Sequence, residues 1–200
     1  MFINWATNEI TLKIVYYGPG LSGKTTNLEF IYNQLDPAMR GDLITLNTQE
    51  DRTLFFDFLK LEFGSIMGKK PRFNLYTVPG QVYYAKSRKL ILSGVDGIVF
   101  VADTQKERMG ENLNTLLDLE ENLIGMGRTL ESFPWVLQLN KVDLPNREHN
   151  HILTQKLNYF DVPQYESIAP KGIGVFETLK SIINLVIANV QKNSTQRNKT

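Results

Sequence analysis

One glycine-rich stretch near the N-terminus most constrains the fold. Residues 18–25 read G-P-G-L-S-G-K-T and match the pattern G-x-x-x-x-G-K-[ST]. The apolar run before it, Ile10–Tyr17, predicts a strand, and Gly23–Leu35 predicts a helix because apolar residues recur there at three- and four-residue spacing. A loop between a strand and a helix is the setting in which this pattern surrounds phosphate groups. A plain glycine turn with an exposed lysine is the weaker alternative, because both neighbouring elements are expected.

The residues of this loop are expected to bind the phosphates of a nucleotide together with a magnesium ion. Glycines allow backbone N–H groups to surround the phosphates, and the positive end of the following helix adds to the attraction. Lys24 places a charge on the outer phosphates, where it also serves catalysis, and the hydroxyl of Thr25 can bind Mg²⁺. The expected phosphate-binding residues are Gly18, Pro19, Gly20, Leu21, Ser22, Gly23, Lys24, Thr25 and Thr26.

Short β-branched or aromatic runs alternate with helical patterns along the chain. This alternation predicts an α/β domain of the P-loop NTPase class, with a mostly parallel six-stranded sheet and helices on both faces. Further strands are expected at Arg52–Phe63, Arg72–Val78, Gly97–Ala102, Phe133–Leu139 and Tyr165–Ile168. Helices are expected at Asn112–Met126 and Val175–Val190, so that one domain spans residues 1–190 and the polar residues 191–200 form a disordered tail.

The composition argues against several classes of function. The 22 Lys and Arg nearly balance the 21 Asp and Glu, so no basic field favours nucleic acid as a partner. With no cysteine, the chain has no disulfide, no thiol nucleophile and no prenyl or palmitoyl anchor. Phe2 stands where myristoylation needs glycine, and no apolar stretch reaches the roughly 20 residues that cross a bilayer. A cytoplasmic monomer without a direct membrane anchor is expected.

The sequence Asn140-Lys141-Val142-Asp143 follows an apolar strand and predicts which base is bound. The carboxylate of Asp143 can accept hydrogen bonds from the ring N–H and the amino group of guanine, and adenine offers no such pair of donors. Sites that depend on hydrogen bonds can discriminate by about 10⁴-fold or more. Asn140 is expected to brace the loop and contact the base, Lys141 to cover the purine ring, and the backbone of Ile168 and Ala169 to add a third contact. A solvated polar turn is the alternative interpretation of this motif.

Residues 77–81 read T-V-P-G-Q and lie at the end of an expected strand. The backbone of Gly80 is expected to contact the outermost phosphate, and the side chain of Gln81 to orient the attacking water. Thr77 stands where many nucleotide switches carry an aspartate that holds a magnesium-bound water. We therefore expect weaker magnesium binding and slow intrinsic hydrolysis, and we expect Thr77→Asp to tighten the affinity for magnesium.

The phosphate loop, the P-G-Q stretch and N-K-V-D together resemble the small Ras-like GTPases over Ile10–Ala188. The stretches G-P-G-L-S-G-K-T-T-N-L, L-N-T-Q-E-D-R-T-L-F-F-D-F-L and L-Y-T-V-P-G-Q narrow the resemblance to the bacterial mutual gliding protein A family, which also has threonine in place of the aspartate. The resemblance implies a GTP/GDP switch, recruited to a cell pole, that controls gliding or pilus motility through polarity effectors. It further implies a roadblock-fold homodimer as the GTPase-activating partner, and a switch strand that slides when GTP replaces GDP.

The same resemblance implies two more site residues, both in the stretch D-R-T-L. Thr53 matches the family's switch threonine and is expected to be the second magnesium ligand, with Thr45 and Thr48 as competing choices. Arg52 matches an arginine with which the family stabilises developing charge from its own chain, an effect worth roughly 10³ to 10⁵ in rate. The alternative for Arg52 is an edge-strand arginine paired with a neighbouring acid.

Three other features have more than one interpretation. His149 and His151 lie in a polar loop without further ligands nearby in sequence, which argues against a metal site. The basic turn formed by Lys69, Lys70 and Arg72 is either solvated or meets an acidic partner or a lipid head group. The run F-F-D-F at residues 55–58 either alternates between core and surface or exposes a partner anchor.

The leading hypothesis for function is a switch that hydrolyses GTP to GDP and phosphate. A scaffold that binds GTP with negligible hydrolysis, a polarity switch for a process other than motility, and an ATP-dependent P-loop enzyme are the alternatives. Gln81 favours hydrolysis over the scaffold, and Asp143 favours GTP over ATP.

Overall fold

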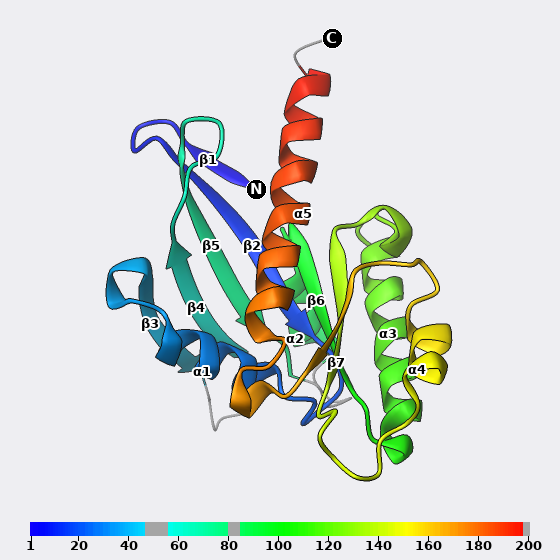
Figure 1. Cartoon of the computed structure of the whole chain (residues 1–200). Helices are drawn as coiled ribbons and strands as arrows, with labels where there is room; N and C mark the ends of the chain where they lie inside the picture. The colour runs from blue at the N-terminus through cyan, green and yellow to red at the C-terminus, as the bar shows by residue number, and fades with distance from the viewer. Residues whose placement is uncertain (47–55, 80–84, 198–200) are drawn as a thin grey trace.

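A single mixed sheet runs through the molecule in this computed structural model, which describes residues 1–46, 56–79 and 85–197 (Figure 1). Within those residues the sheet has eight strands: seven follow the order β3-β4-β5-β2-β6-β7-β8, and β1 pairs with β2 outside this order. The strands are β1 (Phe2–Asn4), β2 (Glu9–Tyr17), β3 (Arg40–Leu46), β4 (Phe56–Glu62), β5 (Lys70–Thr77), β6 (Gly97–Asp103), β7 (Trp135–Asn140) and β8 (Gln164–Ser167). The α-helices are α1 (Lys24–Gln34), α2 (Ala85–Leu92), α3 (Met109–Ile124), α4 (Asn150–Leu157) and α5 (Val175–Arg197).

The centre of the sheet is parallel and its outer strands are antiparallel. β2 pairs in parallel with β5 and β6, β6 with β7, and β7 with β8. The pairs β3 with β4, β4 with β5, and β1 with β2 are antiparallel. The predicted α/β fold is confirmed, but the expectation of six strands was wrong. The sequence did not reveal β1, because three residues show no periodicity, or β3, because Gly41 and Asp42 interrupt its apolar pattern.

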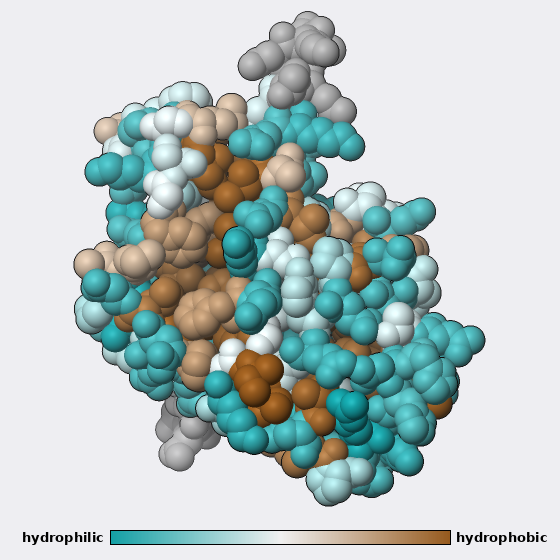
Figure 2. Space-filling model, viewed as in Figure 1, coloured by the Kyte–Doolittle hydropathy of each residue, from teal (hydrophilic) through white to brown (hydrophobic). Residues whose placement is uncertain are grey.

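Alternation along β2 explains why helices cover both faces of the sheet. Leu12, Ile14 and Tyr16 point to one face, where they pack with buried residues of α1 and α5. Val15 and Tyr17 point to the other face, towards α2, α3 and α4. Every residue of β6 is buried, as a central parallel strand requires. Figure 1 shows α5 across the front of the sheet, and Figure 2 shows that apolar residues reach the surface beside it.

The last helix, α5, runs to Arg197 rather than ending near Val190. Its buried face includes Val175, Leu179, Ile182 and Val186, which pack on the sheet and stabilise the helix from its first turns onward. Residues 191–197 contain no glycine or proline, so a helix that has already formed can continue through them at little cost. No helix in the described ranges combines the length and the apolar character needed to span a bilayer.

Candidate functional site

The phosphate loop joins the carboxyl end of β2 to the start of α1, at the edge of the sheet where open α/β folds bind ligands (Figure 1). Gly18 and Gly23 have φ angles of 145° and 98°. A Cβ atom at Gly18 would lie 2.2 Å from the carbonyl oxygen of Val101, and one at Gly23 would lie 2.2 Å from Nδ2 of Asn140. Both positions therefore need glycine for the backbone angle and for the close approach.

The side chain of Lys24 folds back over this loop. Its Nζ donates hydrogen bonds to the carbonyl oxygens of Gly18 and Pro19, at 2.9 and 2.6 Å. Burial lowers the pKa of the Lys24 ammonium to about 7, although the negative charge of Asp57 partly opposes the shift. An ammonium group in these surroundings has too little negative charge nearby, so an anion bound at the loop would stabilise its charged form.

The other loop residues differ in their exposure and hydrogen bonding. Ser22 is fully buried, and its hydroxyl has no hydrogen-bond partner within the described part of the chain. Leu21 lies on the outside of the loop and is 85% exposed. Its backbone has a positive φ of 63°. Thr25 and Thr26 lie in the first turn of α1, Thr25 exposed and Thr26 half-buried.

A buried carboxylate on β4, that of Asp57, gathers three threonine hydroxyls. It accepts hydrogen bonds from Oγ1 of Thr25 at 2.5 Å, of Thr45 at 2.9 Å and of Thr77 at 2.9 Å. The backbone N–H of Asp57 also donates to the Thr77 hydroxyl at 2.8 Å. The structure thus places Thr77 and the predicted magnesium ligand Thr25 on one acidic side chain, which brings a negative charge to the position where Thr77 has none.

Sequence reasoning missed Asp57, although one signal was present. The buried positions of β4 alternate, and Asp57 shares its face with Leu59 and Leu61. A carboxylate on the core-facing side of a strand needs hydrogen-bond partners. An acidic residue at a position where the strand pattern expects an apolar one therefore indicates a buried polar site. Phe56 and Phe58 are both half-buried and contact the ring of Tyr76. Phe55 lies outside the described residues, so the interpretation of the whole run stays a prediction.

Asn140 connects the phosphate loop to the predicted base-binding loops. Its Nδ2 donates to the carbonyl oxygen of Ser22 at 2.8 Å. Its Oδ1 accepts from the hydroxyl of Ser167 and from the backbone N–H of Ala169, each at 3.0 Å. The side chain is only 2% exposed, so all three contacts lie in the interior. The predicted bracing role of Asn140 therefore corresponds to a specific set of bonds.

The remaining residues of the N-K-V-D motif lie at the surface. Lys141 has a φ of 69° and its Nζ donates to the buried carboxylate of Asp103 at 2.6 Å. Asp143 is exposed and its only ion pair among the described residues is with Lys171, at 3.2 Å. An exposed carboxylate held by one exposed lysine can exchange that partner for the donors of a base.

The expected third contact, at Ile168 and Ala169, lies at the end of β8 beside the motif. The Ala169 N–H is already bonded to Asn140, and the carbonyl oxygen of Ile168 accepts from the N–H of Lys171 at 2.9 Å. In this structure the two residues shape the loop and Ala169 supports Asn140. Their contact with a base stays a prediction.

Arg108 is a second residue that sequence reasoning missed. Its Nη2 donates to the carbonyl oxygen of Gly20 at 2.5 Å, and its guanidinium is also held by Glu111 and, at 3.8 Å, by Asp103. Arg108 comes from the 3-10 turn Lys106–Arg108 before α3, far from the loop in sequence. No local pattern could have shown this contact, which fixes the outer rim of the phosphate loop.

Four predicted site residues lie outside the described residues: Arg52, Thr53, Gly80 and Gln81. The competing threonine Thr48 does so as well.

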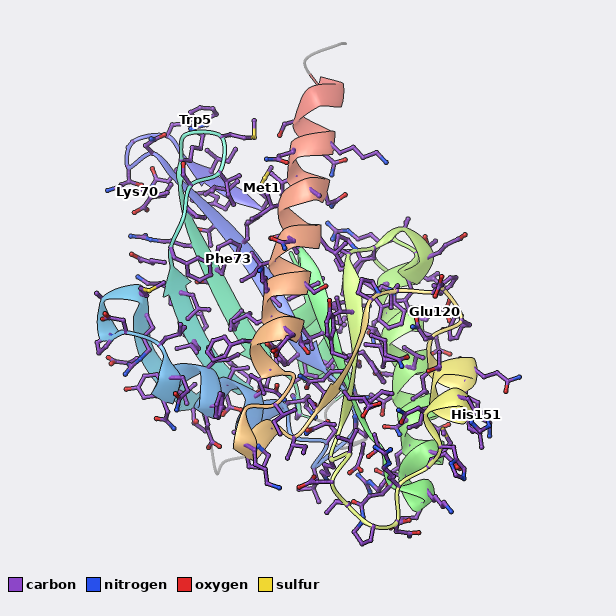
Figure 3. All side chains as sticks on the ribbon, in the orientation of Figure 1. Met1, Trp5, Lys70, Phe73, Glu120 and His151 are labelled. Carbon is purple, nitrogen blue, oxygen red and sulfur yellow. The ribbon has the colours of Figure 1, made fainter. Side chains whose placement is uncertain are left out.

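The two histidines lie away from the phosphate loop (Figure 3): the rings of His149 and His151 are 5.7 Å apart at the start of α4. The described residues contain no group of three or more His, Cys, Asp or Glu side chains that could hold a metal ion.

These observations fit a phosphate-bearing ligand. The loop holds a buried ammonium whose pKa is lowered to about 7 and a buried hydroxyl without a partner among the described residues. The cluster of Thr25 and Asp57 supplies hard oxygen atoms of the kind that Mg²⁺ prefers.

Comparison with known proteins agrees with the geometry. A family model described as the Gtr1/RagA G protein conserved region matches residues 13–167. Elongation factor 4 of Thermosynechococcus vestitus is 27% identical over 149 residues, which cover 72% of this chain but 23% of that protein. The mutual gliding-motility protein MglA of Myxococcus xanthus is 54% identical over 191 residues, which cover 96% of this chain and 98% of that protein. The chain therefore belongs to the family of small G proteins that includes the mutual gliding-motility protein MglA.

Proposed function

We propose that this G protein is a molecular switch that binds GTP, hydrolyses it slowly to GDP and phosphate, and controls cell polarity and gliding or pilus motility. The observation that carries the proposal is the side chain of Asn140, which ties the phosphate loop to the loops of the N-K-V-D motif. One nucleotide can reach both halves of such a site. The motility assignment is supported by the 54% identity to a protein named for gliding motility.

Guanine is the base that this site fits best. The carboxylate of Asp143 is the acceptor for the two donors on guanine, and Lys171 is displaced or shifted when the base binds. The stem of Lys141 covers the purine ring, while its ammonium stays on Asp103. Asn140 keeps these groups at a fixed distance from the phosphate loop.

Thr25 and Thr53 are the proposed protein ligands of Mg²⁺. Asp57 supports the first of them, because the Thr25 hydroxyl can donate its proton to Asp57 while an oxygen lone pair faces the metal. A magnesium ion bound there would neutralise charge on the phosphates. Asp57 also offers the carboxylate that Thr77 lacks, so the absence of an aspartate at position 77 does not argue against magnesium binding.

Hydrolysis is assigned to residues that position the water and stabilise charge. Gln81 orients the water, the Gly80 N–H and Lys24 contact the outermost phosphate, and Arg52 stabilises the charge that develops. A roadblock-fold homodimer is proposed as the activating partner, as the resemblance to the mutual gliding protein A family implies, and its proposed role is to arrange Gln81 and Arg52 for hydrolysis. We further propose that the protein is recruited to cell poles from the cytoplasm.

Replacement of Asp143 by asparagine tests the base assignment. An amide can donate to the 2-oxo group of xanthine but cannot accept from both donors of guanine. We expect Asp143→Asn to weaken GDP binding by about 100-fold or more and to improve xanthosine diphosphate binding, since buried hydrogen bonds dominate such discrimination. Displacement of a fluorescent GDP analogue measures both affinities. Asn184→Asp, at an exposed position of α5, is the control. Equal loss of both nucleotides in Asp143→Asn would contradict the assignment.

Replacement of Arg52 by alanine separates the switch from a scaffold that only binds GTP. We expect single-turnover hydrolysis with the activating partner to fall by roughly 10³-fold or more, while GTP affinity changes little. Lys60→Ala, on β4, is the matched loss of a cation. An unchanged rate in Arg52→Ala would remove Arg52 from catalysis, and an absence of hydrolysis in the unaltered protein with its activator would favour the scaffold.

A further inference from the structure

Two turns form the end of the sheet that lies opposite the phosphate loop. We call residues 5–8, between β1 and β2, and residues 66–69, before β5, the paired turns. Asn8 holds them together: its Nδ2 donates to the carbonyl oxygen of Gly68 at 3.0 Å, and its own carbonyl oxygen accepts from the N–H of Lys70 at 3.0 Å. In Figure 3 Trp5 and Lys70 mark this end of the molecule, and the C-terminal end of α5 lies on the same side. The paired turns are therefore one preformed surface.

Large apolar side chains project from the paired turns into solvent. Trp5 is 76% exposed and Met67 is 59% exposed, and Phe2, on the edge strand that leads into the first turn, is 66% exposed. The Lys69 ammonium lies 4.0 Å from the centre of the Trp5 ring and 3.2 Å from Oδ1 of Asn8. These contacts fix the indole in place without burying it.

The conformation at Met67 indicates that its exposure is not incidental. Ile66 and Lys69 exchange backbone hydrogen bonds of 3.0 and 2.9 Å, so Met67 and Gly68 are the two central residues of a tight hairpin turn. Met67 has a φ of 53° and Gly68 a φ of 74°, angles at which asparagine and glycine are favoured. A methionine at the first position costs roughly 1 kcal/mol or more, and what it adds is an apolar side chain at the tip.

The charges around the paired turns are unevenly neutralised. Arg72 is paired with Glu9 at 2.6 Å and with Glu62 at 3.0 Å, so these two acids are held within the sheet. Within the described part of the chain, neither Lys69 nor Lys70 forms an ion pair, and Lys70 is exposed. The surface next to Trp5 and Met67 is thus cationic.

We propose that the paired turns are a membrane-contact surface, at which Trp5 and Met67 enter the head-group region of a bilayer while Lys69 and Lys70 meet anionic lipids. Tryptophan is enriched at membrane interfaces, and each lysine near an anionic surface contributes about 1 kcal/mol. The surface consists of two reverse turns that expose the side chains of Trp5 and Met67, which suits insertion between lipids better than docking of a folded acidic protein. Contact at this end leaves the phosphate loop open to nucleotide and to protein partners, because the loop lies at the other end of strand β2.

The two tryptophans of the chain allow a direct test. Trp135 is 1% exposed, so a change of fluorescence on contact with vesicles reports Trp5. The full chain with bound GDP is titrated with vesicles of phosphatidylcholine, alone or with phosphatidylglycerol. We expect a blue shift of emission and co-sedimentation only with phosphatidylglycerol present, weakened by 0.5 M salt. The variants Trp5→Ser and Met67→Asn should each reduce co-sedimentation, and Lys69→Glu with Lys70→Glu should reduce it at least about tenfold.

Matched variants on other surfaces complete the experiment. Leu117→Ser on α3, at a site 55% exposed, and Lys156→Glu on α4 should leave co-sedimentation unchanged. Absence of vesicle binding, or equal losses in these controls, overturns the proposal. A shift of Trp5 emission with poly-glutamate but not with anionic vesicles also overturns it and assigns the surface to an acidic protein. The test does not depend on the nucleotide assignment, because the vesicle assay has no hydrolysis readout.

Discussion

At the scale of single residues, burial of the Lys24 ammonium in the phosphate loop lowers the stability of the nucleotide-free protein. This ammonium is buried among backbone carbonyls, and burial lowers its pKa to about 7 from the usual value of 10.5. The unfolded chain therefore binds more protons than the folded chain between about pH 7 and pH 10.5. Stability of the nucleotide-free protein should rise with pH across that window, and the destabilising effect should be complete below it.

Chemical denaturation of nucleotide-free protein measures this effect. We expect the free energy of unfolding to rise between pH 7.5 and 9.5 with a slope of up to about 1.4 kcal/mol per pH unit from Lys24. Lys24→Met should lack this contribution. Saturating GDP should flatten the slope of the unaltered protein, because the phosphates raise the pKa of Lys24. Equal slopes in the variant and the unaltered protein would contradict the burial of a titrating ammonium at position 24.

At the scale of elements, the register between β4 and β5 decides which side chains meet at the proposed magnesium site. Phe58 pairs with Tyr76, which sets Asp57 beside Thr77. The expectation that Thr77→Asp tightens magnesium affinity now has a second part. The new carboxylate would stand next to that of Asp57, and two carboxylates at that separation repel each other when both are ionised.

Thr77→Asp should consequently depend on magnesium far more than the unaltered protein does. With GDP and a chelator at pH 8 we expect its melting temperature to fall by several degrees, and with excess Mg²⁺ to recover. The loss should shrink at pH 5, because repulsion raises the pKa of one carboxyl group in the folded state and that group then binds a proton. Thr77→Val, which adds no charge, is the control. A Thr77→Asp protein that is equally stable with and without magnesium at pH 8 would contradict the geometry.

Some features of the fold and the candidate site could be predicted from the sequence, and others could not. The phosphate loop, its helix α1 and the central strands follow from local patterns, and the structure confirms them. Asp57 and Arg108 could not be assigned, because their partners Thr25 and Gly20 are brought to them only by the packed fold. The end of α5 was placed too early for a related reason, since its buried first turns stabilise a polar segment that would not be helical alone.

At the scale of the whole molecule, one buried polar network links α1, β7 and α5 to the phosphate loop. Gln138 on β7 donates to Asn27 of α1 at 3.0 Å and to Thr178 of α5 at 3.1 Å. Asn27 in turn donates to the carbonyl oxygen of Gly23 at 2.9 Å. A continuous path of hydrogen bonds therefore runs from α5 to the loop through Gln138 and Asn27.

Thr178→Val tests this connection. Removal of the hydroxyl leaves Gln138 with one partner fewer in the interior, and we expect a loss of roughly 1–3 kcal/mol in the free energy of unfolding, measured in urea. GDP affinity should fall as well if Asn27 shifts. Thr115→Val on α3, whose hydroxyl makes no hydrogen bond within the described residues, should change neither quantity. Stability loss without any change in GDP affinity would limit the network to a structural role.

The three bonds of Asn140 have a consequence for how ligands compete in the cell. Because one amide sets the spacing between the two halves of the site, a molecule that carries both a guanine and its phosphates meets the second half at high effective concentration once the first is bound. Guanosine and pyrophosphate each reach one half and gain no such advantage. The proposed site therefore favours the intact guanine nucleotide. Fragments of nucleotides, and phosphates attached to another base, should compete poorly with it even when they are abundant.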